Sequence, residues 1–209
     1  MNTITFRITG RSALMMCNNQ TADPRNEYTK AIKELHTASK RKGADVESLL
    51  EKQSILRVKA GLYWNKELGL HLPAGNLRAT FIDGAKIDRM GSHCSKYTMI
   101  AGPAKIKHPG SDDLEEIAND PRYRYDSIMK SGMVQVPTTR AIVPEWQCEF
   151  TINYAGNDKM TRADIIHFVE QAGNFIGVGA SRKYGFGRFG VEVQDANGKY
   201  PKKEKSKAA

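Results

Sequence analysis

The chain has 209 residues, of which 40% are hydrophobic and 26% are charged, a composition typical of one soluble globular domain. No apolar run reaches the roughly 18 residues of a membrane span, so we expect no transmembrane helix. The formal net charge of +9 and the pI of about 9.4 favour an anionic partner such as a nucleic acid.

Other features of the composition concern the ends of the chain and its compartment. Three widely spaced cysteines are typical of free thiols in a reducing cytoplasm. Arg7 and Arg11 interrupt the N-terminal apolar stretch, which argues against a signal peptide. At the other end, the segment 199–209 contains no apolar residue suited to a core, and its charges over 202–207 sum to +3. We expect one folded domain over 1–198, with a body charge of about +6, followed by a disordered basic tail.

We expect the first half of the chain to form one strand and three helices, over residues 2–9, 24–42, 45–59 and 74–90. Ile4, Phe6 and Ile8 alternate with polar residues, the period of a half-buried strand. Asp23 is the predicted N-cap of the first helix, with Pro24 in its first turn. The first two helices are rich in lysine and glutamate, which predicts that they lie at the surface.

In the second half we expect strands over 96–106, 133–143, 147–154 and 188–193, and a helix over 161–172. Thr161 and Asp164 have the spacing of a capping box at the start of that helix. The strand over 147–154 alternates cleanly and is the predicted hairpin partner of the strand over 133–143. The polar segment 108–125 is expected to be a loop with one short helix.

The order of the main elements predicts an α+β fold with a ferredoxin-like, RRM-like βαββαβ core. Two further segments, about 17–72 and 94–130, are expected to be a helical insertion and a thumb-like insertion. In folds of this kind the open face of the sheet is a place where a nucleic-acid strand can lie.

The most unusual stretch of the sequence is GNFIGVGASRKYGFGRFGVEV, from Gly173 to Val193. It leaves a predicted helix and enters a strand, the reverse of a dinucleotide-binding loop, and Arg182 stands where the third glycine of that motif belongs. Glycines permit positive φ and a close approach of backbone. Two interpretations of the loop are open: it contacts a nucleic-acid strand, or it is a tight turn whose aromatic rings fill the core and whose charges are solvated.

The residue types of this loop match the needs of a nucleic-acid strand. Its cations are suited to phosphate, and its rings to stacking on bases. The cations are Arg182, Lys183 and Arg188, and the rings are Tyr184, Phe186 and Phe189.

The segment IGVGASRKYGFGRFGVEV resembles the C-terminal glycine-rich loop of the RAMP superfamily, the RNA-binding proteins of CRISPR effector complexes. LGLHLPAGNLRATFIDGAK (68–86) is similar to the segment of their backbone subunits in which a proline turn opens a helix. ITFRITGRSALMM is similar to their first strand and the loop that follows it. Together with the strand ending VPEW, these segments also resemble prophage-encoded relatives of the superfamily.

This resemblance implies an RRM-like body, an inserted thumb within 94–130, and subunits that assemble head to tail along single-stranded RNA. The candidate nucleic-acid-binding residues are Arg11, Asn76, Arg78, Gly177, Gly179, Ser181, Arg182, Lys183, Tyr184, Gly185, Phe186, Gly187 and Arg188.

Signals for catalysis are weak. Some backbone subunits of the family cleave RNA with an acidic residue after the first strand, and Asp23 is the carboxylate near that place, although a helix cap explains it better. His71, in LHLPAG, is a second candidate as a general acid or base. His93 and Cys94 are adjacent without a second ligand pair, so we expect neither metal nor cofactor.

We therefore predict a non-catalytic subunit that binds single-stranded nucleic acid and oligomerises along the strand; the family resemblance favours RNA. It would act in a CRISPR-like effector complex or in a phage nucleoprotein filament. One alternative is a phage-encoded mimic of a backbone subunit that acts through protein–protein interaction. The other is an RNA endonuclease, metal-independent or metal-assisted. The sequence leaves RNA versus DNA open.

Overall fold

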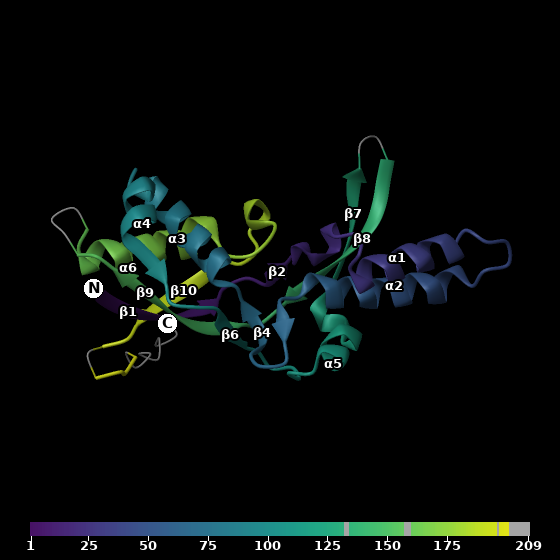
Figure 1. The fold of residues 1–209 in the computed structure, drawn as a ribbon, viewed down its shortest axis with the longest axis horizontal. Helices are drawn as coiled ribbons and strands as arrows, with labels where there is room; N and C mark the ends of the chain where they lie inside the picture. The colour runs from purple at the N-terminus through teal and green to yellow at the C-terminus, as the bar shows by residue number, and fades with distance from the viewer. Residues whose placement is uncertain (132–133, 157–159, 196, 201–209) are drawn as a thin grey trace, which may run out of the picture.

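The computed structural model describes residues 1–131, 134–156, 160–195 and 197–200 and has the expected α+β architecture (Figure 1). Its elements follow the chain in this order: β1 (Asn2–Gly10), β2 (Leu14–Met16), η1 (Asn19–Ala22), α1 (Glu27–Ala38), α2 (Val46–Gly61), β3 (Trp64–Asn65), β4 (Gly69–Leu72), α3 (Ala74–Ile87), α4 (Gly91–Tyr97), β5 (Thr98–Ile100), β6 (Ala104–Lys107), α5 (Leu114–Asn119), η2 (Pro121–Tyr123), β7 (Arg124–Ser131), β8 (Val134–Val143), β9 (Gln147–Tyr154), α6 (Arg162–Gln171), η3 (Ala172–Ile176), η4 (Arg182–Tyr184) and β10 (Phe189–Val193). No helix in these described ranges is long and apolar enough to cross a membrane.

The main sheet has the strand order β10-β1-β9-β6-β4-β3, and β5 also pairs with β9. Every pairing in it is antiparallel among the described residues. The alternating apolar residues predicted in the first strand are buried, and Phe6 lies opposite Phe150 of β9 with ring centroids 5.5 Å apart. Helices α3, α4 and α6 cover one face of the sheet (Figure 1), and Phe81 and Phe168 pack between α3 and α6. The hydrophobic core therefore lies between this sheet face and the helices.

A smaller antiparallel sheet, β2-β8-β7, stands apart from the main one. The prediction that β8 and β9 form a hairpin is wrong, because β8 pairs with β2 and β7 instead. Both edges of β9 are already occupied, by β1 on one side and by β5 and β6 on the other. The alternating pattern over 133–143 does indicate a strand, but such a pattern does not show which other strand pairs with it.

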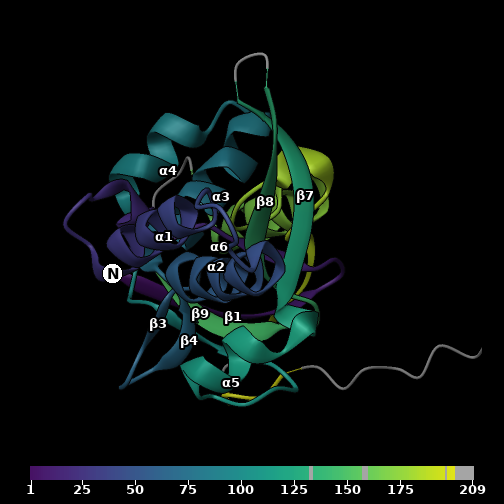
Figure 2. The ribbon, with the colours of Figure 1, turned by 90° about the vertical axis from the view of Figure 1, so that its right-hand side faces the viewer.

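Two hairpins leave the same end of the main sheet (Figures 1 and 2). One is helical, α1 and α2, and the other is formed by β7 and β8. The segment 94–130, proposed from the sequence as an insertion, contains β7 but also β5 and β6, which belong to the main sheet. The strand expected over 96–106 is divided in two by Gly102 and Pro103.

The helix predicted over 24–42 is shorter than expected and begins later. Asn26 is its N-cap, and the Asn26 Oδ1 atom accepts a hydrogen bond from the Tyr28 N–H at 2.9 Å. Asp23 instead binds the side chain of Arg25, at 3.1 Å, so its predicted capping role is wrong. The capping box of α6 is confirmed, with Thr161 and Asp164 each bonded to the other's backbone.

The polar side chains of the main sheet's outer face pair with one another. Thr5 Oγ1 lies 3.0 Å from Thr151 Oγ1, and the Arg7 guanidinium makes ion pairs with Glu149 at 3.0 Å and with Glu192 at 3.5 Å. The ring of Tyr200 lies over Arg7, 3.7 Å from ring centroid to guanidinium carbon. Tyr200, which the sequence places in the tail, thus contacts the main sheet. The remaining tail residues, 201–209, lie outside the described residues.

A buried histidine follows β6. The His108 side chain is 1% exposed, and its Nδ1 atom lies 2.7 Å from the Tyr123 hydroxyl. Burial lowers the pKa of His108, although the Asp112 carboxylate, 3.8 Å from Nε2, acts in the opposite direction.

We predict that this histidine destabilises the fold in mild acid. Because the pKa is lower in the folded state, the unfolded chain takes up the proton first, and the free energy of unfolding should decrease as pH falls below about 6.5. Urea denaturation between pH 8 and pH 5 measures this. His108→Gln should remove that part of the pH dependence, whereas His36→Gln, at an exposed position on α1, should retain it. Equal pH dependence in all three proteins would contradict the assignment.

Candidate nucleic-acid interface

The glycine-rich loop joins the end of α6 to β10 and is held against Ala13 and strand β2. The chain leaves η3 at Gly177, with φ +81°, and the Val178 N–H donates to the Gly187 carbonyl at 2.9 Å. Two more backbone hydrogen bonds of 2.8 Å anchor the loop, from Gly187 to Ala13 and from Ala180 to Met15. The loop is therefore a fixed part of the fold.

Most of the glycines serve this packing. At Gly177, Gly179 and Gly187 φ is positive and a Cβ would meet the protein's own backbone; at Gly179, for example, it would lie 2.5 Å from the Met15 carbonyl oxygen. Gly185 also has positive φ, +89°, but nothing lies within 4 Å of its Cβ position. The close approach expected from the sequence is thus, at three of these four glycines, an approach to this chain and not to a partner.

The cations of the loop meet a cation from α3. Arg182, Lys183 and Arg188 line one surface pocket of about 440 Å³ together with Lys86, and we call it the basic pocket. Phe175 also lines this pocket and is 66% exposed. The next residue, Tyr184, is 72% exposed, and the centroid of its ring lies 4.9 Å from Lys183 Nζ. Four cations and two exposed rings are therefore gathered at one edge of the molecule.

One carboxylate, Asp83 of α3, stands in the wall of the basic pocket. Asp83 accepts from Arg182 Nη1 at 3.0 Å and from Lys86 Nζ at 2.8 Å. Burial raises the pKa of Asp83, but the hydrogen bonds from Lys86 and Arg182 outweigh it and hold the pKa below its ordinary value. Asp83 is therefore ionised at neutral pH, where it positions two cations and offsets part of their charge.

Arg188 lies at the foot of the pocket. Its Nη1 atom is buried and has no hydrogen-bond partner among the described residues. Its backbone is fixed, since the Arg188 N–H donates to Ser12 Oγ at 2.9 Å and its carbonyl accepts from the Arg11 N–H at 2.8 Å. A buried guanidinium N–H without an acceptor is costly.

A second, smaller pocket of about 200 Å³ adjoins the first. Arg182 lines both, and Asn76, near the start of α3, lines the second with Tyr63 and Gly179. Arg78 does not line either pocket, because its Nη2 atom donates to the Ser95 carbonyl at 2.8 Å and ties α3 to α4. Arg11 is exposed beside η3, where it donates to Asn174 at 2.6 Å.

The three aromatic residues of the loop have different environments. Tyr184 is exposed, whereas Phe186 is partly buried and packs edge-on against Tyr125, with ring centroids 5.4 Å apart. Phe189 is 2% exposed and packs against Trp146, so the expectation that it stacks on a base is wrong. As the first residue of β10, with an inward side chain, it belongs to the core.

Sequence reasoning missed Lys86 and Phe175. The signal for Lys86 was its spacing of three residues from Asp83 on a helix, which puts both side chains on one outward face. Phe175 precedes the glycine loop, and its exposure depends on the π-helical turn of η3, which widens the end of α6. No local pattern indicated that turn.

The two catalytic candidates lie outside both pockets. Asp23 is held by Arg25, and the hydrogen bonds from Arg25 lower its pKa. His71 lies in β4, and its Nδ1 atom is 3.0 Å from the Gly69 carbonyl oxygen. In the described ranges no group of three or more His, Cys, Asp or Glu side chains has the arrangement of a metal site.

The outer sheet face, proposed from the sequence as a nucleic-acid platform, differs in charge from the basic pocket. Arg7 is flanked by Glu149 and Glu192 and covered by Tyr200. Its charge is thus balanced within the protein. The features suited to a polyanion lie at the loop edge.

No protein-family model and no curated protein matches the chain. A chain of the cryo-EM structure of the type III-B Cmr-beta bound to cognate target RNA is similar in fold, with a TM-score of 0.54 and 12% sequence identity. The match covers 91% of this chain but 60% of that one, so this chain is similar to a part of it. The crystal structure of Cmr6 from Pyrococcus furiosus matches over 90% of this chain and 96% of that one at 15% identity, but the TM-score of 0.29 is too low to establish a shared fold.

We predict that the loop tolerates a side chain at Gly185 better than at Gly187. Gly185→Ala should cost about 1–2 kcal/mol of unfolding free energy, because an alanine is strained at positive φ even in open space. Gly187→Ala carries the same strain and also drives a Cβ into the Val178 carbonyl, which should add about 1–3 kcal/mol. Urea denaturation of both variants measures the difference, and equal losses would contradict the packing of Gly187 against Val178.

Proposed function

We propose that this chain is a non-catalytic subunit that binds single-stranded RNA in an effector complex of the CRISPR type. The observation that carries the proposal is the basic pocket, with four cations around one carboxylate and two exposed aromatic rings beside them. The fold similarity to a chain from an RNA-bound type III-B structure supports it.

The proposed binding mode follows from the chemistry of the pocket. Phosphates would lie against Arg182 and Arg188, whose guanidinium groups donate paired hydrogen bonds. Lys86 and Lys183 would add charge without fixed direction. Phe175 and Tyr184 would stack on splayed bases, a contact worth about 1–3 kcal/mol per base and tolerant of sequence. Because the loop backbone is already anchored, little of the binding free energy would be lost in ordering it.

We further propose that the four-strand part of the main sheet is a ferredoxin-like core. Its order is β10-β1-β9 followed by β5 and β6, which count as one interrupted strand because both pair with the same edge of β9. Helices α3 and α6 lie on one face (Figure 1), as in a split βαβ pair. The α1–α2 and β7–β8 hairpins would then be the insertions, with β7–β8 in the place of the thumb. Head-to-tail assembly along RNA, and a phage origin, remain predictions from the family resemblance.

The two alternatives differ in what accompanies the purified protein and in what it does to RNA. A mimic of a backbone subunit would purify free of nucleic acid and capture a protein of the host complex. A nuclease would cleave RNA, and one substitution, at Asp23 or His71, would abolish cleavage. Neither residue lies in the basic pocket or in the smaller pocket beside it, so the geometry favours binding without catalysis.

We predict that Arg182→Ala and Arg188→Ala each weaken binding to a short oligouridine RNA. Each variant should also reduce the slope of log K against log salt by about 0.7, the value for one phosphate contact on a single strand. Fluorescence anisotropy at several salt concentrations measures both quantities. Arg25→Ala, which removes an exposed cation far from the loop in sequence and paired with Asp23, is the matched control. If all three variants bind as the parent does, the site is wrongly placed.

We predict that Asp83→Asn strengthens RNA binding, because it removes the negative charge that offsets Arg182 and Lys86. The gain should be up to about fivefold at low salt, the equivalent of about 1 kcal/mol, the upper end of the range for an ion pair at a protein surface. Glu116→Gln, at an exposed position on α5, removes the same charge elsewhere and should leave affinity unchanged. A loss of affinity in Asp83→Asn would mean that Asp83 is needed to position the cations.

A further inference from the structure

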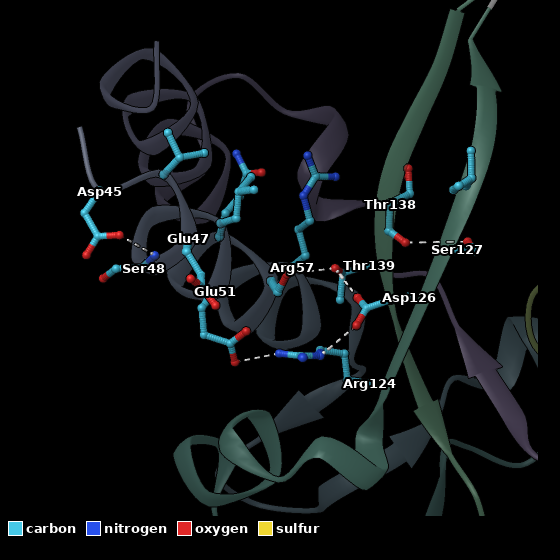
Figure 3. Close-up of a pocket in the computed structure, with 15 residues that line it drawn as sticks. Asp45, Glu47, Ser48, Glu51, Arg57, Arg124, Asp126, Ser127, Thr138 and Thr139 are labelled. Carbon is cyan, nitrogen blue, oxygen red and sulfur yellow. Dashed lines mark hydrogen bonds and ion pairs between the residues drawn. The ribbon is translucent and has the colours of Figure 1, made fainter. Parts of the chain in front are cut away.

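A groove of about 1100 Å³ lies between the two hairpins that leave the main sheet. One wall is α2 and the other is formed by β7 and β8 (Figure 3). The basic pocket is made by other elements, so the two surfaces can be altered and tested separately.

The base of the groove is closed by a satisfied polar network. Arg124 of β7 makes ion pairs with Glu51 of α2 at 2.6 Å and with Asp126 at 3.0 Å. Thr139 of β8 donates to Asp126 at 2.6 Å and lies 2.9 Å from Ser54 of α2 (Figure 3). These contacts join the two walls and use up the charges of the residues that form them.

Arg57 is different. It points from α2 into the space between the walls (Figure 3), and no carboxylate of the described residues lies within ion-pair distance of it. Burial lowers the pKa of Arg57, with no compensating acidic neighbour. A partly desolvated guanidinium without a partner is costly, and a carboxylate brought by a ligand would recover that cost.

Aliphatic side chains flank the groove on both walls. Val46 and Leu50 of α2 are 45% and 49% exposed, and Ile128 of β7 is 70% exposed. Large aliphatic residues facing each other across a groove are typical of a surface that binds apolar side chains. Water or a small ion at Arg57 would leave these three residues uncovered.

The charge of the lining argues against a nucleic acid here. Beyond the network at the base, the groove is lined by two further carboxylates, Asp45 and Glu47, whereas Arg57 is the one additional cation among the described lining residues. A polyphosphate strand would meet this excess of negative charge, but a single carboxylate at Arg57 would not.

We propose that this groove binds an amphipathic segment of another protein. The segment would place aliphatic side chains against Leu50 and Ile128 and one Asp or Glu side chain against Arg57. Affinity would come from the apolar contacts, and the orientation of the segment would be set by the ion pair.

The test uses a displayed library of random 12-residue peptides selected on the immobilised full-length protein. Selected peptides should carry an acidic residue close to aliphatic ones. Arg57→Met should weaken their binding by at least about tenfold, whereas Lys52→Met, which removes an exposed cation of α2 outside the groove lining, should not. Ile128→Ser should weaken the same peptides. Peptides without acidic residues, or binding indifferent to Arg57, would overturn the proposal.

Three controls separate peptide binding from a structural role of Arg57, from RNA contact and from self-association. Arg57→Met should keep or raise the melting temperature, since it removes an unpaired and partly buried charge; a clear decrease would mean that Arg57 is structural. Its affinity for oligouridine RNA should equal that of the parent; a loss would place the groove on the RNA path. Self-association of the parent that Arg57→Met abolishes in sedimentation would identify the occupant as a second copy. Each of these contrary results would overturn the proposal without bearing on the basic pocket.

Discussion

The candidate site depends on the packing of the glycine-rich loop against Ala13 and strand β2. Gly179 and Gly187 lie so close to the backbone of this chain that no side chain fits, and hydrogen bonds to Ala13 and Met15 hold the loop there. Because this contact fixes the backbone of residues 177–188, the side chains of Arg182 and Arg188 have defined places before any ligand arrives.

A counter-ion then organises the charge. Asp83 lies on α3, far in sequence from the loop, and its carboxylate holds both Arg182 and Lys86. Without it, Arg182 and Lys86 would lose their shared hydrogen-bond acceptor, and the net positive charge of the basic pocket would increase. With it, the pocket keeps a net positive charge, and the packing of α3 on the main sheet sets where the cations lie. Asp83 therefore stabilises the arrangement of the cations but reduces the charge that could attract an anion.

The two faces of the main sheet have separate uses. One face carries the core beneath α3 and α6, and the other is a polar surface in which Arg7 is neutralised by Glu149 and Glu192. The β7–β8 hairpin is joined to α2 by the ion pair between Arg124 and Glu51, so the β7–β8 and α1–α2 hairpins are connected, with a groove between them. Two surfaces of opposite character, one cationic and one apolar with excess carboxylates, are thus formed by different elements of the chain.

Local patterns were sufficient for the parts of this protein that depend on neighbours in sequence. The period of β1, the capping box at Thr161 and the positive-φ glycines of the loop were all readable, because each is decided within a few residues. The loop cations and Tyr184 could also be recognised from the sequence, because they lie within a few residues of one another along the chain. The first helix was placed wrongly because Asp23 and Asn26 are both good caps, and a local pattern does not choose between them.

Everything that depends on long-range contact was decided by the tertiary structure. Three features involve contacts between separate elements. Strand β8 pairs with β2 and β7, and Lys86 and Asp83 of α3 lie beside Arg182 of the loop. Arg78 and Phe189 contact other parts of the protein and do not line the candidate interface. The period of a strand shows which of its faces is buried. The backbone N–H and C=O groups along its edges, however, can pair equally well with any suitable strand. The neighbour is chosen by how the whole core packs.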